Sequence, residues 1–306
     1  MELWFLGTSA GMPVRGRNVT SIALRTSQNS GSFWMFDCGE GTQHQLLHTS
    51  LKLTRMSKLF ITHLHGDHVY GLPGLLSSRS SLGCTDSLHI YGPPGLRELI
   101  ETNFRITGTH LGYPLRIVEV VEGVLFEDDD LTVEVAKLDH RIDSYGYRIM
   151  EHDRPGVLNA RWLAEIGVPP GPVYGQLKAG DDVTLKDGRV IRSADAVGQS
   201  LRGCIVTILG DTRPCNNAVK LGKGADVLIH EATFTHDLAD KAYEYGHSTA
   251  LQAAEIAQAA GAQRLFITHF SSRYMLADLA NLEVEARSVF SRTDAAMELK
   301  RYSITL

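Results

Sequence analysis

The chain has 306 residues, of which 43% are hydrophobic and 21% are charged, so it can build one large core or two closely packed halves. Its formal net charge of −5 argues against a protein that coats nucleic acid through global positive charge. No apolar run is long enough to cross a bilayer, and the four cysteines form neither a disulfide framework nor a paired zinc motif.

The N-terminal segment, residues 1–7, is predicted to be the first strand, and it lacks the basic start of a signal peptide. We therefore expect a cytoplasmic protein that has no membrane partner. A glycine-rich loop follows this strand and leads into Pro13-Val-Arg15-Gly-Arg17-Asn18. Local positive charge of this kind can hold a polyanionic substrate even in a chain that is acidic overall.

The next predicted strand, residues 58–62, ends in a dense set of metal-binding side chains. His63, His65, Asp67 and His68 lie within six residues. A strand cannot direct so many side chains to one point, because they alternate between its faces, whereas the turn after a strand can. Imidazole and carboxylate ligands together suit zinc, manganese or iron. An ordinary polar loop is the alternative, but this spacing favours a hydrolase site with two metal ions.

Other strand-like runs also end in candidate ligands. The pentapeptide of residues 59–63 recurs letter for letter at 265–269, so His269 ends the second copy as His63 ends the first. The runs 131–138, 204–209 and 225–229 lead to His140, Asp211 and Glu231. Because loops at strand ends carry function on a rigid base, we expect these ends to converge on one site.

Helix-compatible stretches separate the strands, at residues 95–105, 249–260 and 281–290. The stretch 249–260 is rich in helix formers, and Gly261 after it is a natural C-cap. Strands and helices alternate in two halves of similar pattern, which predicts an α/β sandwich with two sheets inside and helices outside.

One segment, residues 151–199, departs from this alternation because it is rich in proline and glycine turns. A flexible linker is one interpretation. Its apolar residues, including Trp162 and Leu177, favour a partly packed arm that is inserted into a single domain spanning 1–306. Its charges nearly balance and do not identify a nucleic-acid surface.

A centre with two zinc ions needs about four ligands per ion and a bridging group. Asp211 is the best bridge, since a carboxylate has two oxygens. We expect the first ion to be bound by His63, His65, His140 and Asp211. We expect the second ion to be bound by Asp67, His68, Asp211 and His269. Asp67 is also placed to accept the proton of an attacking water.

The HxHxDH motif at residues 63–68, with the later His, Asp and His, resembles the metallo-β-lactamase superfamily. The resemblance covers most of the chain and implies an αββα sandwich. It says little about the substrate, because this fold hosts lactamases, thioesterases, sulfatases, phosphodiesterases and nucleases.

Further motifs resemble the ribonuclease Z family. Residues 13–18 are similar to its PxKxRN loop, which implies substrate contact by Arg15, Arg17 and Asn18; Arg15 stands where the family usually has lysine. Residues 230–233 and 246–249 match its HEAT and later histidine motifs, which implies that His247, oriented by Glu231, transfers a proton to the leaving group. The alternative for His247 is a neighbour of a helix N-cap formed by Ser248 or Thr249.

The arm also resembles this family, through the GxPxGP element formed by Gly167, Pro169, Gly171 and Pro172, with Lys178 as a candidate phosphate contact. The resemblance implies an arm that grips tRNA and a homodimer. It implies a zinc-dependent endoribonuclease, supported also by Mn²⁺ or Co²⁺, that removes the 3′ trailer of precursor tRNA and leaves a 3′ hydroxyl. Added exonuclease trimming stays open, and DNA is not an expected partner. Two alternatives remain: a two-metal phosphodiesterase of small or cyclic nucleotides, and an RNA-binding protein with a degenerate site.

Overall fold

The computed structural model describes residues 1–27 and 31–304. The chain divides into two compact units. The larger unit comprises Met1–Met150 and Ile205–Leu306, and the smaller unit comprises Glu151–Cys204. Within the described residues, no helix is long and apolar enough to pass through a membrane.

The larger unit contains two sheets. The first has the strand order β18-β1-β3-β4-β5-β6-β7. Its strands are antiparallel from β18 to β4 and parallel from β4 to β7. Its bounds are β1 Glu2–Gly7, β3 Ser21–Arg25, β4 Phe33–Phe36, β5 Met56–Phe60, β6 Leu88–Gly92, β7 Leu115–Glu119 and β18 Arg301–Ser303.

The second sheet has the order β17-β15-β14-β13-β10-β9-β8, with β17 to β13 parallel and β10 antiparallel to β13. Its bounds are β8 Gly123–Glu127, β9 Leu131–Leu138, β10 Ser144–Glu151, β13 Ile205–Leu209, β14 Val227–Glu231, β15 Leu265–Thr268 and β17 Thr293–Ala295. Two short strands, β2 Ser9–Ala10 and β16 Phe270–Ser271, pair in parallel and link the sheets at the end where the candidate ligands lie.

Aromatic side chains join the inner faces of the two sheets. The ring centroids of Phe5 and Phe266 lie 5.5 Å apart, and those of Phe60 and Tyr147 lie 5.2 Å apart. The buried Tyr147 hydroxyl donates to the carbonyl of Ile61 across the interface at 2.7 Å. Tilted and edge-to-face rings pack closely and add to the burial of apolar area, so the sheets form one continuous core.

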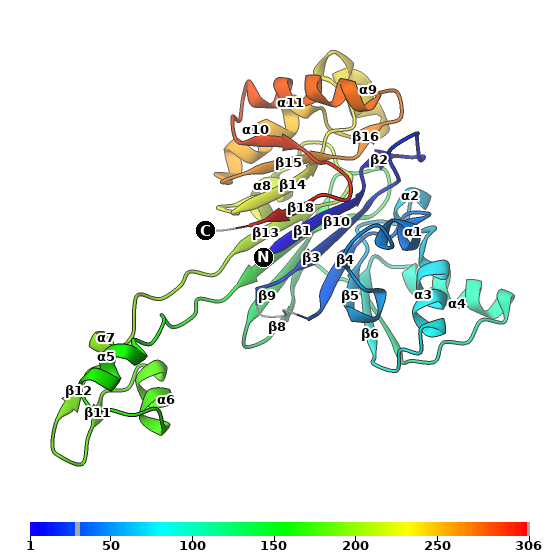
Figure 1. Cartoon of the computed structure of the whole chain (residues 1–306). Helices are drawn as coiled ribbons and strands as arrows, with labels where there is room; N and C mark the ends of the chain where they lie inside the picture. Colours follow the sequence, from blue (N-terminus) through cyan, green and yellow to red (C-terminus); the bar gives the residue numbers. More distant parts are fainter. Residues whose placement is uncertain (28–30, 305–306) are drawn as a thin grey trace. The chain divides into compact units, whose positions relative to one another are not determined.

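Helices cover the outer faces, so the predicted αββα sandwich is confirmed (Figure 1). The first sheet is covered by α1 Thr42–Leu46, α2 Gly66–Val69, α3 Leu72–Ser81 and α4 Leu96–Thr107. The second sheet is covered by α8 Asn216–Gly222, α10 Ala250–Ala260 and α11 Leu279–Arg287, and the short helix α9 Ala239–Tyr245 precedes α10. Short 3₁₀ turns η1 Leu53–Arg55, η2 His236–Leu238 and η3 Leu276–Asp278 complete this unit.

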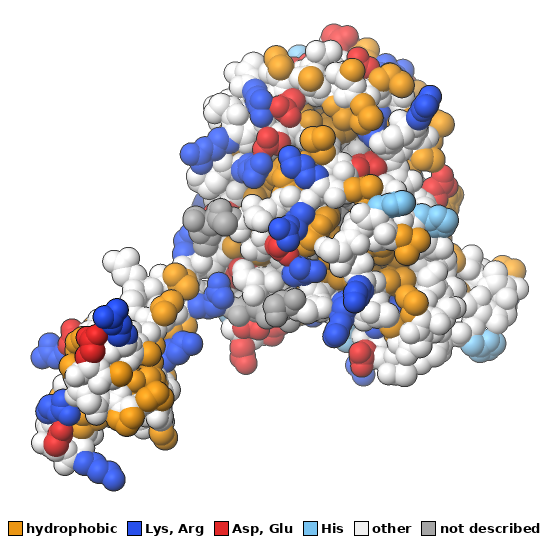
Figure 2. Space-filling model, viewed as in Figure 1, with side chains coloured by type: hydrophobic (Ala, Val, Ile, Leu, Met, Phe, Trp, Pro, Cys, Tyr) orange, Lys and Arg blue, Asp and Glu red, His pale blue; other side chains and the backbone are white. Residues whose placement is uncertain are grey.

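The smaller unit has a core of its own. It contains α5 Ala160–Glu165, α6 Pro172–Ala179, β11 Val183–Thr184, β12 Val190–Ile191 and α7 Ser193–Ala196. Leu163, Leu177 and Ile191 are buried there, with Trp162 packed against them. Apolar contacts, and not only turns, therefore hold this segment together. Figure 2 shows Lys and Arg side chains among the hydrophobic ones on its surface.

Candidate metal centre

The candidate ligands come from the ends of four strands. His63 and His65 follow β5, and Asp67 and His68 lie on the short helix α2 directly after them. The remaining candidates follow β9, β13 and β15 of the other sheet and are His140, Asp211 and His269. Both sheets present these ends at the same edge of the sandwich, so the structure brings together all seven side chains expected from the sequence.

The first group of ligands consists of His63, His65, His140 and Asp211, whose ligand atoms lie within 4.8 Å of one another. His140 Nε2 lies 3.2 Å from His65 Nδ1, and His63 Nε2 lies 3.6 Å from Asp211 Oδ2. The second group consists of Asp67, His68 and His269. Asp211 lies between the groups, because its Oδ2 is 3.4 Å from His269 Nε2 and its Oδ1 is 3.6 Å from His68 Nε2.

These residues fit a divalent metal. His63 Nε2 is buried and has no hydrogen-bond partner among the residues that the structure describes, which is costly for an imidazole nitrogen unless a cation binds it. His68 Nε2 and His269 Nε2 face each other at 3.2 Å, and only one of two such nitrogens can carry a proton toward the other. Imidazole nitrogens with carboxylate oxygens are the donor set of catalytic zinc and of related transition-metal ions.

The second nitrogen of each of four histidines is held by a partner outside the ligand set. Thr62 Oγ1 lies 3.0 Å from His63 Nδ1, and Asp37 Oδ2 lies 2.8 Å from His68 Nδ1. Thr233 Oγ1 lies 3.0 Å from His269 Nδ1, and the carbonyl of Gly246 lies 2.7 Å from His140 Nδ1. Such partners fix the tautomer and orientation of a metal-binding imidazole.

Asp37 was not among the residues predicted for the site, although it obeys the same rule as the others. It directly follows a buried strand, β4, and has a positive φ of 58°, which is rare for a residue other than glycine. Its carboxylate also accepts from the backbone and hydroxyl of Thr62 at 2.7 and 2.8 Å. Asp37, at the end of β4, is therefore connected to the segment after the neighbouring strand β5, through Thr62 and through His68 on α2. An acidic residue at a strand end was the available signal.

The surroundings of His63 and Asp211 favour the protonation states that bind metal. Those of His68 favour its charged form: burial lowers the pKa of His68, but the charges of Asp211, Asp67 and Asp37 outweigh burial and raise it well above its ordinary value. Burial lowers the pKa of His63 well below its ordinary value, and the charge of His68 lowers it further, so its imidazole is neutral. Burial raises the pKa of Asp211, but the neighbouring imidazoles, with His269 and His68 first among them, outweigh burial and hold this pKa well below its ordinary value. Neutral imidazole and ionised carboxylate are the ligand forms.

His247 and Glu231 form a pair beside the ligands. His247 Nδ1 lies 2.9 Å from Glu231 Oε1, which leaves Nε2 free to face a substrate. Burial lowers the pKa of His247, but the charge and hydrogen bond of Glu231 outweigh burial and raise it to about 9. The Glu231 carboxylate is itself held by the backbone of Thr212 at 3.0 Å and the hydroxyl of Thr233 at 2.6 Å. The pair therefore offers a charged, oriented imidazolium.

The segment after His247 begins helix α10, and Thr249 is its N-cap. Thr249 and Gln252 form a reciprocal capping box, and Gly261 is the C-cap at φ 64°, as predicted. Ser248 does not cap the helix, because its hydroxyl donates to the carbonyl of Thr212 at 2.6 Å. His247 thus stands next to a capped helix start and beside the ligands at the same time, so its two interpretations are compatible.

The loop of residues 8–18 lies against the second group of ligands. The backbone N–H of Gly11 donates to Asp67 Oδ2 at 2.6 Å. Arg15 is exposed and available to a ligand, but Arg17 is buried. The Arg17 guanidinium donates to the carbonyls of Phe270, Ser271 and Tyr274 at 3.1, 3.2 and 2.6 Å. This differs from the expected substrate contact: Arg17 joins its loop to β16, because buried guanidinium groups must be paired.

The expectation for Asn18 changes for the same reason. Its side chain donates to the carbonyl of Glu40 at 2.8 Å, and its backbone N–H donates to Glu298 at 2.9 Å. The carboxylate of Glu298 also accepts from the N–H and hydroxyl of Thr8 at 2.8 and 3.0 Å, and from Gln45 Nε2 at 3.0 Å. Glu298 therefore ties both ends of the loop together. No sequence signal pointed to it, since its partners lie about 250 to 290 positions away.

The remaining predicted residues lie in the smaller unit. Gly167, with φ 81°, follows α5, and Gly171 and Pro172 form the start of α6. Pro169 is exposed, and so is Lys178 in the last turn of α6. Proline at the first helical position and a positive-φ glycine shape the turn between these two helices. The GxPxGP element thus forms this turn.

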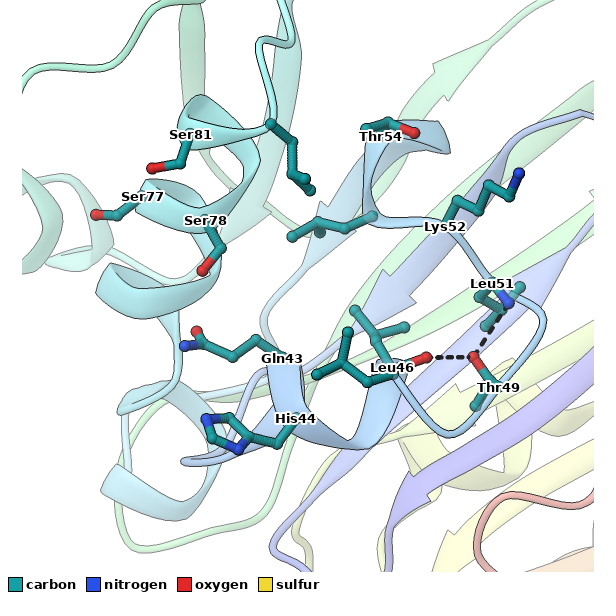
Figure 3. Close-up of a pocket in the computed structure, with 13 residues that line it drawn as sticks. Gln43, His44, Leu46, Thr49, Leu51, Lys52, Thr54, Ser77, Ser78 and Ser81 are labelled. Atoms are coloured by element: carbon teal, nitrogen blue, oxygen red, sulfur yellow. Dashed lines mark hydrogen bonds between the residues drawn. The ribbon is translucent and has the colours of Figure 1, made fainter.

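A separate groove lies between α1 and α3 (Figure 3). It has a volume of about 750 Å³ and an apolar floor that includes Leu46 and Leu51, with Lys52 and the serines of α3 along it. None of the candidate ligands lines this groove. His44 contributes to its wall.

Comparison with known proteins agrees with the geometry. The fold is shared with the metallo-β-lactamase fold protein YhfI from Bacillus subtilis, at a TM-score of 0.70, 18% identity and 98% coverage of both chains. The sequence model of one family, the anti-Pycsar protein Apyc1, matches residues 1–109. The chain therefore has the metallo-β-lactamase fold, and its histidine and aspartate clusters could hold divalent metal ions.

More specific relatives cover the whole chain. Ribonuclease Z of Bacillus licheniformis is 52% identical over 304 residues, with 99% of both chains covered, and that of Bacillus cereus is 50% identical over 305 residues, again with 99% covered. The crystal structure of human tRNase Z, short form, matches with a TM-score of 0.73 and 32% identity over 100% of both chains. This chain belongs to the ribonuclease Z family.

Proposed function

We propose that this protein is an endoribonuclease that removes the 3′ trailer of precursor tRNA. It cuts after the discriminator, the last nucleotide before the trailer, and leaves a 3′ hydroxyl on the tRNA and a 5′ phosphate on the trailer. One observation carries the proposal: the histidine and aspartate ligands stand beside the oriented His247–Glu231 pair in a chain that matches ribonuclease Z over 99% of its length. Since newly made tRNA is the substrate, we place the enzyme in the cytoplasm.

The ligands suit two zinc ions, with Mn²⁺ or Co²⁺ as substitutes. His63, His65, His140 and Asp211 would hold one ion, and Asp67, His68, Asp211 and His269 the other. Bound metal supplies Lewis acidity, which lowers the pKa of water and stabilises charge on a phosphoryl group. The protein supplies a buried site in which outer partners such as Asp37 fix the imidazoles in place.

The chain's own residues handle the protons of the reaction. Asp67, whose Oδ2 is held by the N–H of Gly11, accepts the proton of the attacking water. Water oxygen bonds to phosphorus as the bond to the 3′ oxygen of the discriminator breaks. His247 Nε2 donates its proton to that oxygen, and Glu231 stabilises the imidazolium before transfer. Arg15 is the exposed cation of the loop and contacts the RNA backbone.

The smaller unit recognises the body of the tRNA. Its core holds it as a structured arm, and its exposed cations, among them Lys178, Lys186 and Arg192, are placed to meet phosphates. The GxPxGP turn at 167–172 shapes the presenting surface. We further propose that the enzyme acts as a homodimer on RNA and not on DNA; sedimentation of the metal-loaded protein at two concentrations tests the dimer, and a monomer at both excludes it.

The activity is tested with an end-labelled precursor tRNA and a linear RNA of matched sequence and length. A single cut next to the discriminator, made only in the folded tRNA, supports the proposal. A variant in which a short Gly-Ser linker replaces residues 152–203 should lose this cut while it still hydrolyses bis(p-nitrophenyl) phosphate. Good turnover of the small diester by the intact protein without any RNA cut would instead favour a phosphodiesterase of small substrates.

A further inference from the structure

An exposed aromatic residue lies four positions before His247, the proton donor of the proposed reaction. Tyr243 lies on α9, which ends at Tyr245 and leads through Gly246 into His247. It is 69% exposed, although large aromatic side chains are usually packed. The backbone of this residue lies close to that of His247, because the N–H of His247 donates to the carbonyl of Ala242, which directly precedes Tyr243, at 2.8 Å.

One face of the Tyr243 ring is covered by a neighbouring cation. The Arg213 guanidinium lies over it, with its central carbon 4.8 Å from the ring centroid. Arg213 is itself fixed, because Nε donates to the carbonyl of Tyr243 at 2.7 Å and Nη1 to Asp139 at 3.1 Å. A cation on one face of the ring, with the rest open to solvent, makes a preorganised stacking surface.

Hydrogen bonds set the position of this surface relative to the reacting groups. The N–H of Gly246 donates to the carbonyl of Tyr243 at 3.1 Å, and the N–H of His247 donates to the carbonyl of Ala242 at 2.8 Å. The carbonyl of Gly246 is the partner of His140 Nδ1. A Cβ at Gly246 would lie 2.8 Å from that nitrogen, so only glycine allows this contact. Tyr243 is therefore connected rigidly to both His247 and the candidate metal centre.

The chemistry decides which nucleotide reaches this ring. In the proposed reaction His247 protonates the 3′ oxygen of the discriminator, so the sugar and base of that nucleotide lie on the His247 side of the phosphorus. The trailer lies beyond the 5′ oxygen, which stays on phosphorus. We infer that Tyr243, backed by Arg213, is the platform on which the discriminator base stacks. This inference rests on the proposed function and adds a binding contact that positions the bond to be cut.

The test separates stacking from a merely structural role by removing the base instead of the whole nucleotide. Two precursor tRNAs are compared, one intact and one with an abasic discriminator, and kcat/KM is measured for each. The wild type should prefer the intact substrate by on the order of tenfold, which is the usual effect of one base on an aromatic side chain. Tyr243→Ala should cut the intact substrate as slowly as the wild type cuts the abasic one, and should no longer distinguish the two. Tyr243→Phe should behave as wild type.

Tyr245→Ala is the matched control. It removes the same kind of side chain, 43% exposed, from the same helix. Tyr245 lies about 200° around the helix axis from Tyr243, and its ring contacts Lys241 instead of Arg213. It should keep the wild-type preference. Tyr245→Ala should also hydrolyse bis(p-nitrophenyl) phosphate at the wild-type rate. A preference that survives in Tyr243→Ala, or disappears equally in Tyr245→Ala, overturns the inference. A wild type that cuts neither precursor would instead refute the proposed function.

Discussion

The carboxyl group of Glu298 is predicted to make the stability of the larger unit depend on pH in an unusual direction. Burial raises the pKa of Glu298 from its ordinary value of 4.5 to about 7, against the hydrogen bonds of Thr8 and Asn18 and the charge of Arg17. A carboxyl whose pKa is higher in the folded than in the unfolded state favours folding while it is protonated. That contribution is complete below pH 4.5 and is lost as the pH rises through 7.

The size of the effect follows from the two pKa values. The difference between 4.5 and about 7 corresponds to about 3 kcal/mol of unfolding free energy. Glu298→Gln keeps the shape but cannot ionise, so it removes the pH dependence. The variant amide cannot accept the hydrogen bond from Gln45, which costs about 1 kcal/mol of unfolding free energy. A protonated Glu298 carboxyl loses the same hydrogen bond, so this cost is common to both proteins at low pH. The two proteins should therefore have similar free energies of unfolding near pH 4.5. By pH 8 the free energy of unfolding of the variant should exceed that of the wild type by about 3 kcal/mol.

The assay is urea unfolding of both proteins from pH 4.5 to 8 at one metal concentration. The signal is the fluorescence of Trp4 and Trp34, which are buried in the larger unit. Titration of all other groups is common to both proteins and cancels in the difference. Glu255→Gln, at an exposed position on α10, controls for the change in net charge. The reasoning would be refuted if the wild type became more stable than Glu298→Gln as the pH rises. Such a result would mean that the hydrogen bonds to Glu298 lower its pKa by more than burial raises it.

Three further predictions concern the site. His247→Asn should lower kcat on precursor tRNA by roughly 10²–10⁴-fold but leave bis(p-nitrophenyl) phosphate turnover within about tenfold, since nitrophenolate leaves without a proton; equal losses would remove His247 as the acid. Arg15→Ala should raise KM for precursor tRNA without a change in the unfolding free energy. Arg17→Met should lower the unfolding free energy by at least ~2 kcal/mol, because three charge-assisted hydrogen bonds are lost. Urea titrations that show a loss of stability for Arg15→Ala and none for Arg17→Met would contradict the two assignments. Chelation should abolish turnover and lower the melting temperature, and added Zn²⁺ should restore both; a melting temperature that stays constant would argue against tightly bound metal.

Much of the candidate metal centre could be predicted from the sequence because its ligands follow a local rule. Each lies at the end of a strand-like apolar run or in the short turn and helix that follow one, and such runs are visible as periodic burial. The strand of residues 131–138 has the predicted bounds, and the helix predicted at 249–260 lies at Ala250–Ala260. The helix predicted at 281–290 lies at Leu279–Arg287, because packing rather than propensity decides where it starts and ends.

What the sequence by itself determined is therefore the class of fold, the positions of the strands to within about two residues, and the candidate metal-binding side chains at their ends. Only the tertiary structure decided how the other polar groups are used. The loop motif predicts that Arg17 contacts the substrate, but its guanidinium donates hydrogen bonds to carbonyls about 250 residues away. Asp37 and Glu298 acquire their hydrogen-bond partners only when segments that are distant in the sequence pack together. The physical reason is that periodicity reports burial, which is local, whereas the partner of a buried charge is set by packing between segments that the order of residues does not reveal.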